Sequence, residues 1–390
     1  MKERYYSLDV FRGATVALMI LVNNQGSPTY APLDHAPWNG CTPTDLVFPF
    51  FLFAVGNAMS FVIPRFREKG TSYFLQKVIK RTLLIFLIGL LLNWSPFLFY
   101  SHDHITFKPW EWIADDGNAA GVRVLGVLQR IALCYFLASL IVYFFKPKAA
   151  FIICAFLLFI YWWLCFSFGD PADPYSLKGY FGTNIDKATL GDLHMYHGEG
   201  VAFDPEGWMG TLSATVQVVF GYFVGQYIQQ KGKNYEMLSN LFIAAVVLLF
   251  TGYCWDMVFP VNKKIWTSSY TIYTTGLAII VLCTLIFLIE FKNRKGAWSR
   301  FFDVFGKNPL FIFVLSGFIP RILSLIRIND GTDEHGQPKY ISPLYWLYEH
   351  AFKDHFYDQR LGSVLYAVSL ITVYWLIVYV LDKRKIYIRV

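Results

Sequence analysis

Ten long runs of apolar residues constrain the fold of this chain more than any other feature of its sequence. Nine of the runs, of 18–24 residues, match the roughly 20 apolar residues that a helix needs to cross a bilayer, and the first, of 15 residues, is short and has a polar end. Only 16% of the 390 residues are charged, whereas soluble domains carry about 25%. We therefore predict an all-α fold, a polytopic membrane helix bundle in which residues 1–390 form a single transmembrane domain. The ten predicted spans are Val10–Asn24, Leu46–Ile63, Val78–Phe97, Val124–Phe145, Ala149–Phe168, Trp208–Gln229, Met237–Val258, Thr267–Glu290, Phe305–Leu325 and Ser363–Leu381.

The basic residues orient the predicted bundle. If both termini lie inside, most of the 34 Lys and Arg residues fall in the inner connecting segments. Such an excess in cytoplasmic loops is the general rule, so we expect the N-in, C-in orientation. The formal net charge of +7 then belongs to the inner rim of the bundle. Because no nucleic-acid-binding motif accompanies this charge, we expect the lipid bilayer as a partner and no nucleic acid.

The predicted outer connections are long, and the inner ones are mostly short turns. Long connections without secondary structure of their own tend to be functional. We therefore expect recognition to take place on the outer face. A charged aromatic stretch within the last of these connections, Leu344–Phe356, is expected to lie at the interface or to re-enter the membrane. The outer connections are Gln25–Asp45, Tyr100–Arg123, Gly169–Gly207 and Arg327–Gly362.

The first outer connection concentrates polar residues directly before an apolar run. His35 and Asp45 are ten residues apart, close enough for the chain to fold one onto the other. A carboxylate against an imidazole sets its tautomer and raises its basicity, so the pair could be a general base with its orienting partner. Asp45 could also be the N-cap of the second helix. Asn23 ends the first span, where it could serve as a helix cap.

Two arginines lie within or beside predicted spans. A charged side chain is costly to place there, so both residues are candidates for a functional role. Arg12 is three residues after Asp9, which allows either a local ion pair or a cationic gate for an anionic ligand. Arg130, next to Gln129, needs a carboxylate partner or a ligand phosphate.

The histidines and cysteines favour no metal site. His102 with His104, and His194 with His197, could contribute ligands, but no third fixed ligand accompanies either pair. We expect these histidines to be solvated loop residues and the protein to use no metal. The six cysteines lie mostly in apolar runs and form no C-x-x-C motif, which is typical of packing residues.

Seven motifs occur in a fixed order: SLDVFRG, VN, H-x-x-WNG followed by DLVFPFFLFAVG, GVLQR, GDLHMYH, VAFDPEG and PVNKKIWTSSY. Together they resemble the heparan-alpha-glucosaminide N-acetyltransferase family over residues 7–269, and more weakly to the C-terminus. The resemblance implies a transmembrane acyltransferase that moves acetyl from cytosolic acetyl-CoA to a glucosamine amine on the far side. It also suggests a bacterial relative in the inner (cytoplasmic) membrane, with a small-molecule amino sugar at the periplasmic face. A homodimer is compatible with it.

The resemblance also implies roles for particular residues. The family's catalytic histidine corresponds to His35, and its asparagine and aspartate correspond to Asn23 and Asp45. His35 would be the general base or would itself accept the acetyl group. Asn23 or Asn39 would donate hydrogen bonds to the oxyanion. Trp38 would form a wall for the sugar or for the pantetheine arm of CoA.

Charged residues complete the expected site. By position, the candidates for the CoA phosphates lie near the inner face, and Arg130 is a further candidate for ligand binding. Acidic residues of the third outer connection would attract a cationic glucosamine. These residues are Arg12, Lys80 and Arg81 at the inner face, and Asp204 and Glu206 at the outer face.

Two alternatives remain open from the sequence. A bundle of about ten helices with buried Arg and Asn would also suit a sugar transporter. An acyltransferase could act on another cell-envelope glycan instead of glucosamine. Release of CoA distinguishes the enzyme from the transporter.

Overall fold

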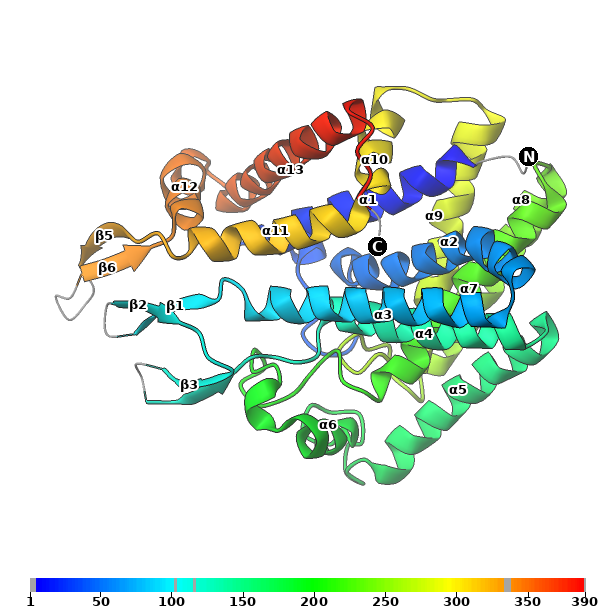
Figure 1. The fold of residues 1–390 in the computed structure, drawn as a ribbon, viewed down its shortest axis with the longest axis horizontal. Helices are drawn as coiled ribbons and strands as arrows, with labels where there is room; N and C mark the ends of the chain where they lie inside the picture. Colours follow the sequence, from blue (N-terminus) through cyan, green and yellow to red (C-terminus); the bar gives the residue numbers. More distant parts are fainter. Residues whose placement is uncertain (1–4, 102–103, 115–116, 333–337, 389–390) are drawn as a thin grey trace.

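A computed structural model describes residues 5–101, 104–114, 117–332 and 338–388, and these residues are mostly helical (Figure 1). Long helices run side by side and make up the body of the molecule. Two further helices, α10 and α11, meet at a bend of 81° directly before Pro309. The helices are α1 (Tyr6–Asn23), α2 (Val47–Lys69), α3 (Thr71–Trp94), α4 (Val127–Phe144), α5 (Pro147–Phe168), α7 (Gly210–Lys231), α8 (Tyr235–Asp256), α9 (Ser268–Ile286), α10 (Ala297–Lys307), α11 (Pro309–Leu323) and α13 (Gln359–Lys383).

Among the described residues, seven helices are long and apolar enough to cross a membrane, or eight if the bent pair is one span. The two other predicted spans coincide with α3, which carries Lys77, Lys80 and Arg81, and with α7, which is rich in Gln, Thr and Gly. Each of the ten predicted spans therefore overlaps a helix or the bent pair. The crossing of all ten, the N-in, C-in orientation and the single-domain organisation stay predictions.

The fold is mostly helical, in line with the predicted helical class, and two of the long connections also contain short antiparallel hairpins. All three hairpins project from one end of the bundle, on the left of Figure 1. Strands of three to five residues are too short for an alternating pattern to stand out in the sequence. The pairs are β1 (Leu98–Ser101) with β2 (His104–Phe107), β3 (Glu111–Ile113) with β4 (Ala119–Gly121), and β5 (Ile328–Thr332) with β6 (Pro338–Ile341).

Short helices occupy the remaining outer connections. The third connection contains α6 (Gly182–Leu190) and a 3-10 turn at Asp192–His194. The aromatic stretch near the C-terminus forms α12 (Pro343–Ala351), which leads into α13. In Figure 1, α12 lies near the β5–β6 hairpin, whereas α6 lies at the lower edge of the molecule, near one end of α5.

Glycines bring α2 and α7 into close contact at the centre of the bundle. A Cβ on Gly56 of α2 would lie 1.9 Å from the Val218 carbonyl oxygen. A Cβ on Gly221 of α7 would lie 2.1 Å from the Phe53 carbonyl oxygen. The two helix backbones therefore touch where any side chain would keep them apart. This contact matters for the site because α2 continues directly from the turn that contains Asp45.

We expect Gly56→Ala to destabilise the protein by roughly 1–3 kcal/mol or more, because the added methyl group meets backbone that cannot rotate away. Thermal unfolding of the purified protein in detergent would measure the loss. Gly317→Ala in α11 is the matched control, since its new Cβ would lie 3.5 Å from the nearest atom, on Leu92. Equal melting temperatures for the two variants would contradict the close α2–α7 packing.

Candidate functional site

Asp45 lies in a 3-10 turn, Pro43–Leu46, that precedes α2. Pro43 begins this turn, and the Thr42 backbone N–H donates to Asp45 Oδ2 at 3.0 Å. The prediction that Asp45 is the N-cap of the second helix is therefore wrong, since α2 begins two residues later, at Val47. Because the turn begins at the proline, the Asp45 carboxylate lies inside the turn. Its second oxygen, Oδ1, is available to another partner.

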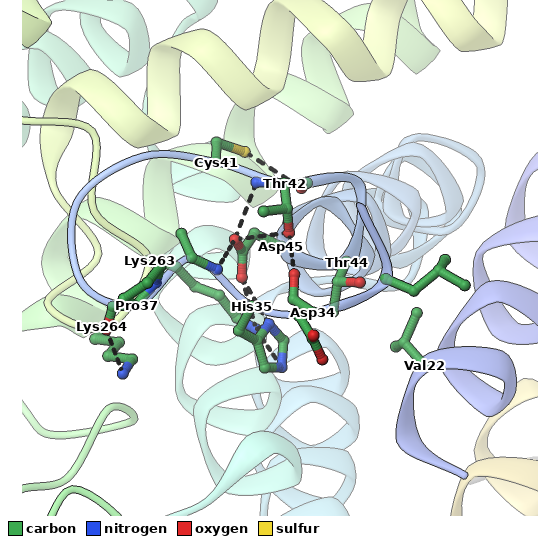
Figure 2. Close-up of polar contacts among 12 residues, drawn as sticks. Val22, Asp34, His35, Pro37, Cys41, Thr42, Thr44, Asp45, Lys263 and Lys264 are labelled. Atoms are coloured by element: carbon green, nitrogen blue, oxygen red, sulfur yellow. Dashed lines mark hydrogen bonds and ion pairs between the residues drawn. The ribbon is translucent and has the colours of Figure 1, made fainter. Parts of the chain in front are cut away.

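That second oxygen contacts the imidazole of His35. His35 Nδ1 and Asp45 Oδ1 are 2.7 Å apart, and the Ala36 backbone N–H donates to Oδ2 at 3.1 Å (Figure 2). The Asp45 side chain is 1% exposed and that of His35 is 50% exposed. An ionised carboxylate only accepts hydrogen bonds, so Nδ1 carries the hydrogen and the lone pair of Nε2 remains available. The contact between His35 and Asp45 expected from their spacing is present.

Lys263 is a third member of this cluster, and the sequence analysis did not single it out. Its Nζ lies 3.0 Å from His35 Nδ1, 3.3 Å from Nε2 and 3.5 Å from Asp45 Oδ1. An atom at similar distances from both ring nitrogens cannot lie along the in-plane lone pair of either, so the ammonium lies over the face of the ring. Burial lowers the pKa of Lys263, while Asp45 and Glu206 act in the opposite direction. The only sequence signal for it was the PVNKKIWTSSY motif.

The segment that carries Lys263 is docked onto the His35 loop by paired polar groups. The Gly40 backbone N–H donates to the Val261 carbonyl at 2.7 Å, and Asn262 Nδ2 donates to Asn39 Oδ1 at 3.1 Å. Asn39, expected to donate to an oxyanion, accepts this bond through Oδ1 and so helps to hold the two segments together. Lys264 follows Lys263 but donates elsewhere, to the Pro37 carbonyl (Figure 2) and to Glu199, both at 2.8 Å.

His35 faces a cavity of about 290 Å³, called the outer chamber below. Five of the predicted site residues line it: Asn23, His35, Trp38, Asp45 and Glu206. The indole of Trp38 is anchored, because Nε1 donates to the Tyr175 carbonyl at 2.8 Å. The remaining walls are largely apolar and come mainly from α1, α2 and α4. They include Met19, Val22, Val47, Phe48, Phe51, Val127, Ile131 and Trp266.

Asn23 is the last residue of α1, and its neighbour supplies the cap. Asn24 occupies the C-cap position, and its side-chain Nδ2 donates to the Ile20 carbonyl at 2.9 Å. The proposed capping role of Asn23 is therefore wrong. Its side chain is exposed and lines the outer chamber instead, which keeps it available to a ligand.

Asp204 and Glu206 are both bound by Arg123, another residue that the sequence analysis passed over. Arg123 Nε and Nη2 donate to the two Asp204 oxygens at 3.0 and 2.6 Å, and Nη2 also donates to Glu206. Burial alone would lower the pKa of Arg123, but Glu206 and Asp204 outweigh it and hold the pKa above its ordinary value. The two acids are therefore ion-paired and buried, with Glu206 at the wall of the outer chamber.

Arg130 contacts backbone and an aromatic ring. It is 1% exposed, its Nη2 donates to the Gly207 carbonyl at 2.8 Å, and its guanidinium lies 5.2 Å from the centre of the Trp266 ring. Among the described residues, no carboxylate lies within 4 Å of it, and it does not line the outer chamber. Because Trp266 does line that chamber, these contacts indicate a role in supporting its wall.

A second cavity, of about 670 Å³, lies toward the other end of α1 and α2, and we call it the inner chamber. Arg12 lines it and bonds to Asp9 and to the Gly306 carbonyl, both at 2.7 Å. Arg65, Asn57 and Gln229 add polar groups. The other predicted phosphate-binding residues lie elsewhere, Lys80 exposed on α3 and Arg81 over the ring of Tyr135 at 4.9 Å.

The candidate metal ligands are placed as follows. His102 lies outside the described residues. His194 is buried rather than solvated as predicted, with Nδ1 2.8 Å from the Val122 carbonyl and Nε2 3.1 Å from Glu111. Within the described part of the chain, no group of three or more His, Cys, Asp or Glu side chains could hold a metal ion.

The chain is similar to proteins with an assigned activity. A family model for "Heparan-alpha-glucosaminide N-acetyltransferase, catalytic" matches residues 4–177, which include Asn23, His35 and Asp45 but not Lys263. The heparan-alpha-glucosaminide N-acetyltransferase of Homo sapiens is 26% identical, with 89% of this chain and 58% of that protein aligned. That of Mus musculus is 25% identical, with 100% of this chain and 61% of that protein aligned.

These matches confirm the resemblance inferred from the ordered motifs. The chain spans about three fifths of the length of the two curated relatives. Apolar helices long enough to span a bilayer are consistent with an integral membrane protein.

Asp186 of α6 supports the segment that carries Asp204 and Glu206, because it accepts from the Trp208 backbone N–H at 2.9 Å. Burial raises its pKa to about 7, above an unfolded value of about 3.9. A carboxyl group with a raised pKa contributes stability that is full below about pH 4 and lost as the pH rises through 7.

Asp186→Asn keeps an acceptor oxygen without the charge, so we expect a higher melting temperature than wild type at pH 8 and little difference at pH 4. Asp192→Asn, at an exposed carboxylate, is the control. A pH-independent effect of Asp186→Asn would contradict the raised pKa.

Proposed function

We propose that this relative of the heparan-alpha-glucosaminide N-acetyltransferases transfers an acetyl group from acetyl-CoA to the amine of a glucosamine-type sugar at its outer face. The observation that carries the proposal is the His35–Asp45 pair at 2.7 Å, with His35 facing a largely apolar chamber. This is the arrangement of a general base or nucleophile with its orienting carboxylate. A site of this kind is needed for acyl transfer and is not needed to bind and release a sugar unchanged.

The chemistry follows from the free lone pair of His35 Nε2. In direct transfer, the sugar amine attacks the thioester carbonyl carbon, Nε2 takes the amine proton, the C–S bond breaks, and that proton passes to the CoA thiolate. In the covalent alternative, Nε2 attacks the carbonyl carbon, the C–S bond breaks and CoA leaves as the thiolate. The amine then attacks the acetyl carbon, the bond between that carbon and Nε2 breaks, and the amine proton passes to the CoA thiolate. In both routes Asp45 holds the ring orientation and stabilises its positive form.

The negative charge that develops on the carbonyl oxygen needs nearby donors. Lys263 Nζ lies beside the His35 ring nitrogens, where the reacting carbon must also approach. The Asn23 amide lines the same chamber. We assign oxyanion stabilisation to Lys263 and Asn23, and not to Asn39, which does not line this chamber. Trp38, fixed by its bond to Tyr175, is placed as an apolar wall for substrate.

The two chambers suggest how donor and acceptor reach one centre. Both are lined by α1 and α2, the inner one around Arg12 and the outer one around Asn23. Eleven residues of helix separate these positions, about 16 Å at 1.5 Å per residue. We place the CoA phosphates at the inner chamber near Arg12 and Arg65, and its extended pantetheine arm along α1 and α2 toward His35. The acceptor would enter from the outer side.

Bilayer topology completes the proposal. With the inner chamber on the cytoplasmic side, the enzyme uses cytosolic acetyl-CoA and modifies an acceptor on the opposite side of the membrane. In a bacterial inner membrane, that opposite side is the periplasm. An acceptor from another cell-envelope glycan would use the same chemistry. A sugar transporter remains the alternative from another class, and acceptor-dependent CoA release by the purified protein separates it from the enzyme.

We expect His35→Ala to lower acceptor-dependent CoA release by at least about 10²–10⁴-fold, because it removes the base or nucleophile. The assay uses purified protein in detergent, with acetyl-CoA as donor and glucosamine as acceptor. Expression and melting temperature should change little, since the His35 side chain is half exposed. Asp45→Asn, which keeps the shape but not the charge, should lower the rate strongly and retain acetyl-CoA binding. Substantial activity in His35→Ala would exclude its proposed role.

We expect Lys263→Met to lower kcat by about 10²–10³-fold, the usual effect of losing one oxyanion donor. The loss should appear mainly in kcat rather than KM, because the charge on the oxygen develops only in the transition state. Lys264→Met is the matched control, since its ammonium bonds to Pro37 and Glu199 and not to His35. Equal losses of kcat in the two variants would count against a specific role of Lys263.

A further inference from the structure

The side-chain nitrogen of Lys263 lies over the face of the His35 ring, as its similar distances of 3.0 and 3.3 Å from the two ring nitrogens require. Both side chains line the outer chamber, and Figure 2 shows Lys263 directed toward His35 and Asp45. A primary amine is thus 3.3 Å from Nε2, the atom that attacks acetyl-CoA in the covalent route.

This position matches the direction from which an acetyl-imidazole is attacked. An acetyl group on Nε2 stays close to the ring plane, because its carbonyl shares electrons with the ring nitrogen as in a peptide bond. A nucleophile therefore reaches the carbonyl carbon from above or below that plane. Because Nζ already lies over one face of the ring, a small rotation of the lysine chain brings it within the roughly 3–3.5 Å that reaction requires.

The surroundings of Lys263 also favour the neutral amine, which is the nucleophilic form. Its side chain is 22% exposed. Burial lowers the pKa of Lys263, while Asp45 and Glu206 act in the opposite direction and only partly offset it. Withdrawal from water is one of the ways in which proteins make a lysine nucleophilic. Lys263 is therefore more reactive toward an acyl group than a lysine in solvent.

The next residue, Lys264, has a similar exposure and different contacts. Its side chain is 19% exposed. Its Nζ donates to the Pro37 carbonyl and to Glu199, both at 2.8 Å, and lies 5.7 Å from the centre of the Trp38 ring. The two adjacent lysines thus differ mainly in their position relative to His35, so a difference in their acetylation reports on that position.

We propose that Lys263 is a self-acetylation site, whose amine takes the acetyl group from His35 when no sugar amine occupies the outer chamber. This inference rests on the covalent route of the proposed function. It adds to that function a modification of the protein itself, in which acetyl-CoA is consumed without a sugar.

The step balances as follows. Lys263 loses a proton to solvent, and the lone pair of its neutral Nζ attacks the acetyl carbon on Nε2. The bond between that carbon and Nε2 breaks, and its electron pair returns to the imidazole. The remaining excess proton on Nζ passes through Nε2 to the CoA thiolate. The products are an acetylated lysine, the original His35 and CoA.

Acetylation of Lys263 would inactivate the site. The product is an amide, which does not return its acetyl group to His35 or to a sugar as the acetyl-imidazole does. The modified nitrogen also has no positive charge, so it loses the ability to stabilise the oxyanion as an ammonium does. A bound sugar amine protects the enzyme, because it takes the acetyl group first.

The test incubates the purified protein in detergent with acetyl-CoA and no sugar, and follows acetylation by peptide mass spectrometry. Fragment spectra distinguish Lys263 from Lys264. We expect Lys263 to be acetylated at least about tenfold faster than Lys264, because its acetyl group comes from a side chain in contact with it. CoA should be released in the same amount as acetyl-lysine forms, and activity with glucosamine should fall in parallel.

Three comparisons identify the source of the acetyl group. His35→Ala should reduce acetylation of Lys263 to the rate of Lys264. Lys264→Arg should leave acetylation of Lys263 as in wild type. Glucosamine added to wild type together with acetyl-CoA should slow acetylation of Lys263, because the two amines compete for one acetyl group. This last comparison needs no variant.

The outcomes separate self-acetylation from the proposed function. Equal acetylation of Lys263 and Lys264 in wild type, or fast acetylation of Lys263 that persists in His35→Ala, overturns the inference. Fast acetylation of Lys263 without acceptor-dependent CoA release supports it and contradicts the sugar transferase. Acceptor-dependent CoA release with Lys263 unmodified in the absence of sugar supports the transferase and overturns self-acetylation.

Discussion

The candidate site is organised around the carboxylate of Asp45. It is almost fully buried, and it accepts from the Thr42 and Ala36 backbone through one oxygen while the other faces His35 and Lys263. A buried carboxylate is tolerable only when such partners replace the water it has lost. The same contacts that stabilise the charge also set the tautomer of His35 and bring Lys263 to its ring. Structure and proposed chemistry therefore depend on a single group.

The helix packing explains why this group lies where a substrate can meet it. Glycines allow α2 and α7 to touch, and α2 begins directly after the Asp45 turn. The outer ends of α1, α2 and α4 do not close completely and leave the outer chamber. The inner chamber lies toward the other end of α1 and α2. The proposed reaction brings a donor from one side and an acceptor from the other to His35.

Prediction from the sequence succeeded where the relevant information was local. The ten apolar runs all overlap helices, and the ten-residue spacing of His35 and Asp45 did predict a contact. It failed where two adjacent residues compete for one role. Asn23 and Asn24 are chemically identical, and only the path of the last helical turn decides that Asn24 is the cap. The partners of Arg130 are a backbone carbonyl and an indole ring, and residue type alone cannot predict these partners.

By itself, the sequence determined a mostly helical fold rich in apolar helices, the similarity to a transferase family, and the contact between His35 and Asp45. Apolar runs, ordered motifs and short loops are all properties of residues that are near one another in the chain, so they can be read from the sequence. Only the tertiary structure placed Lys263 on His35, 228 residues away in sequence, and Arg123 on Asp204 and Glu206. Contacts between distant segments arise from how helices pack, and packing leaves no regular pattern along the chain.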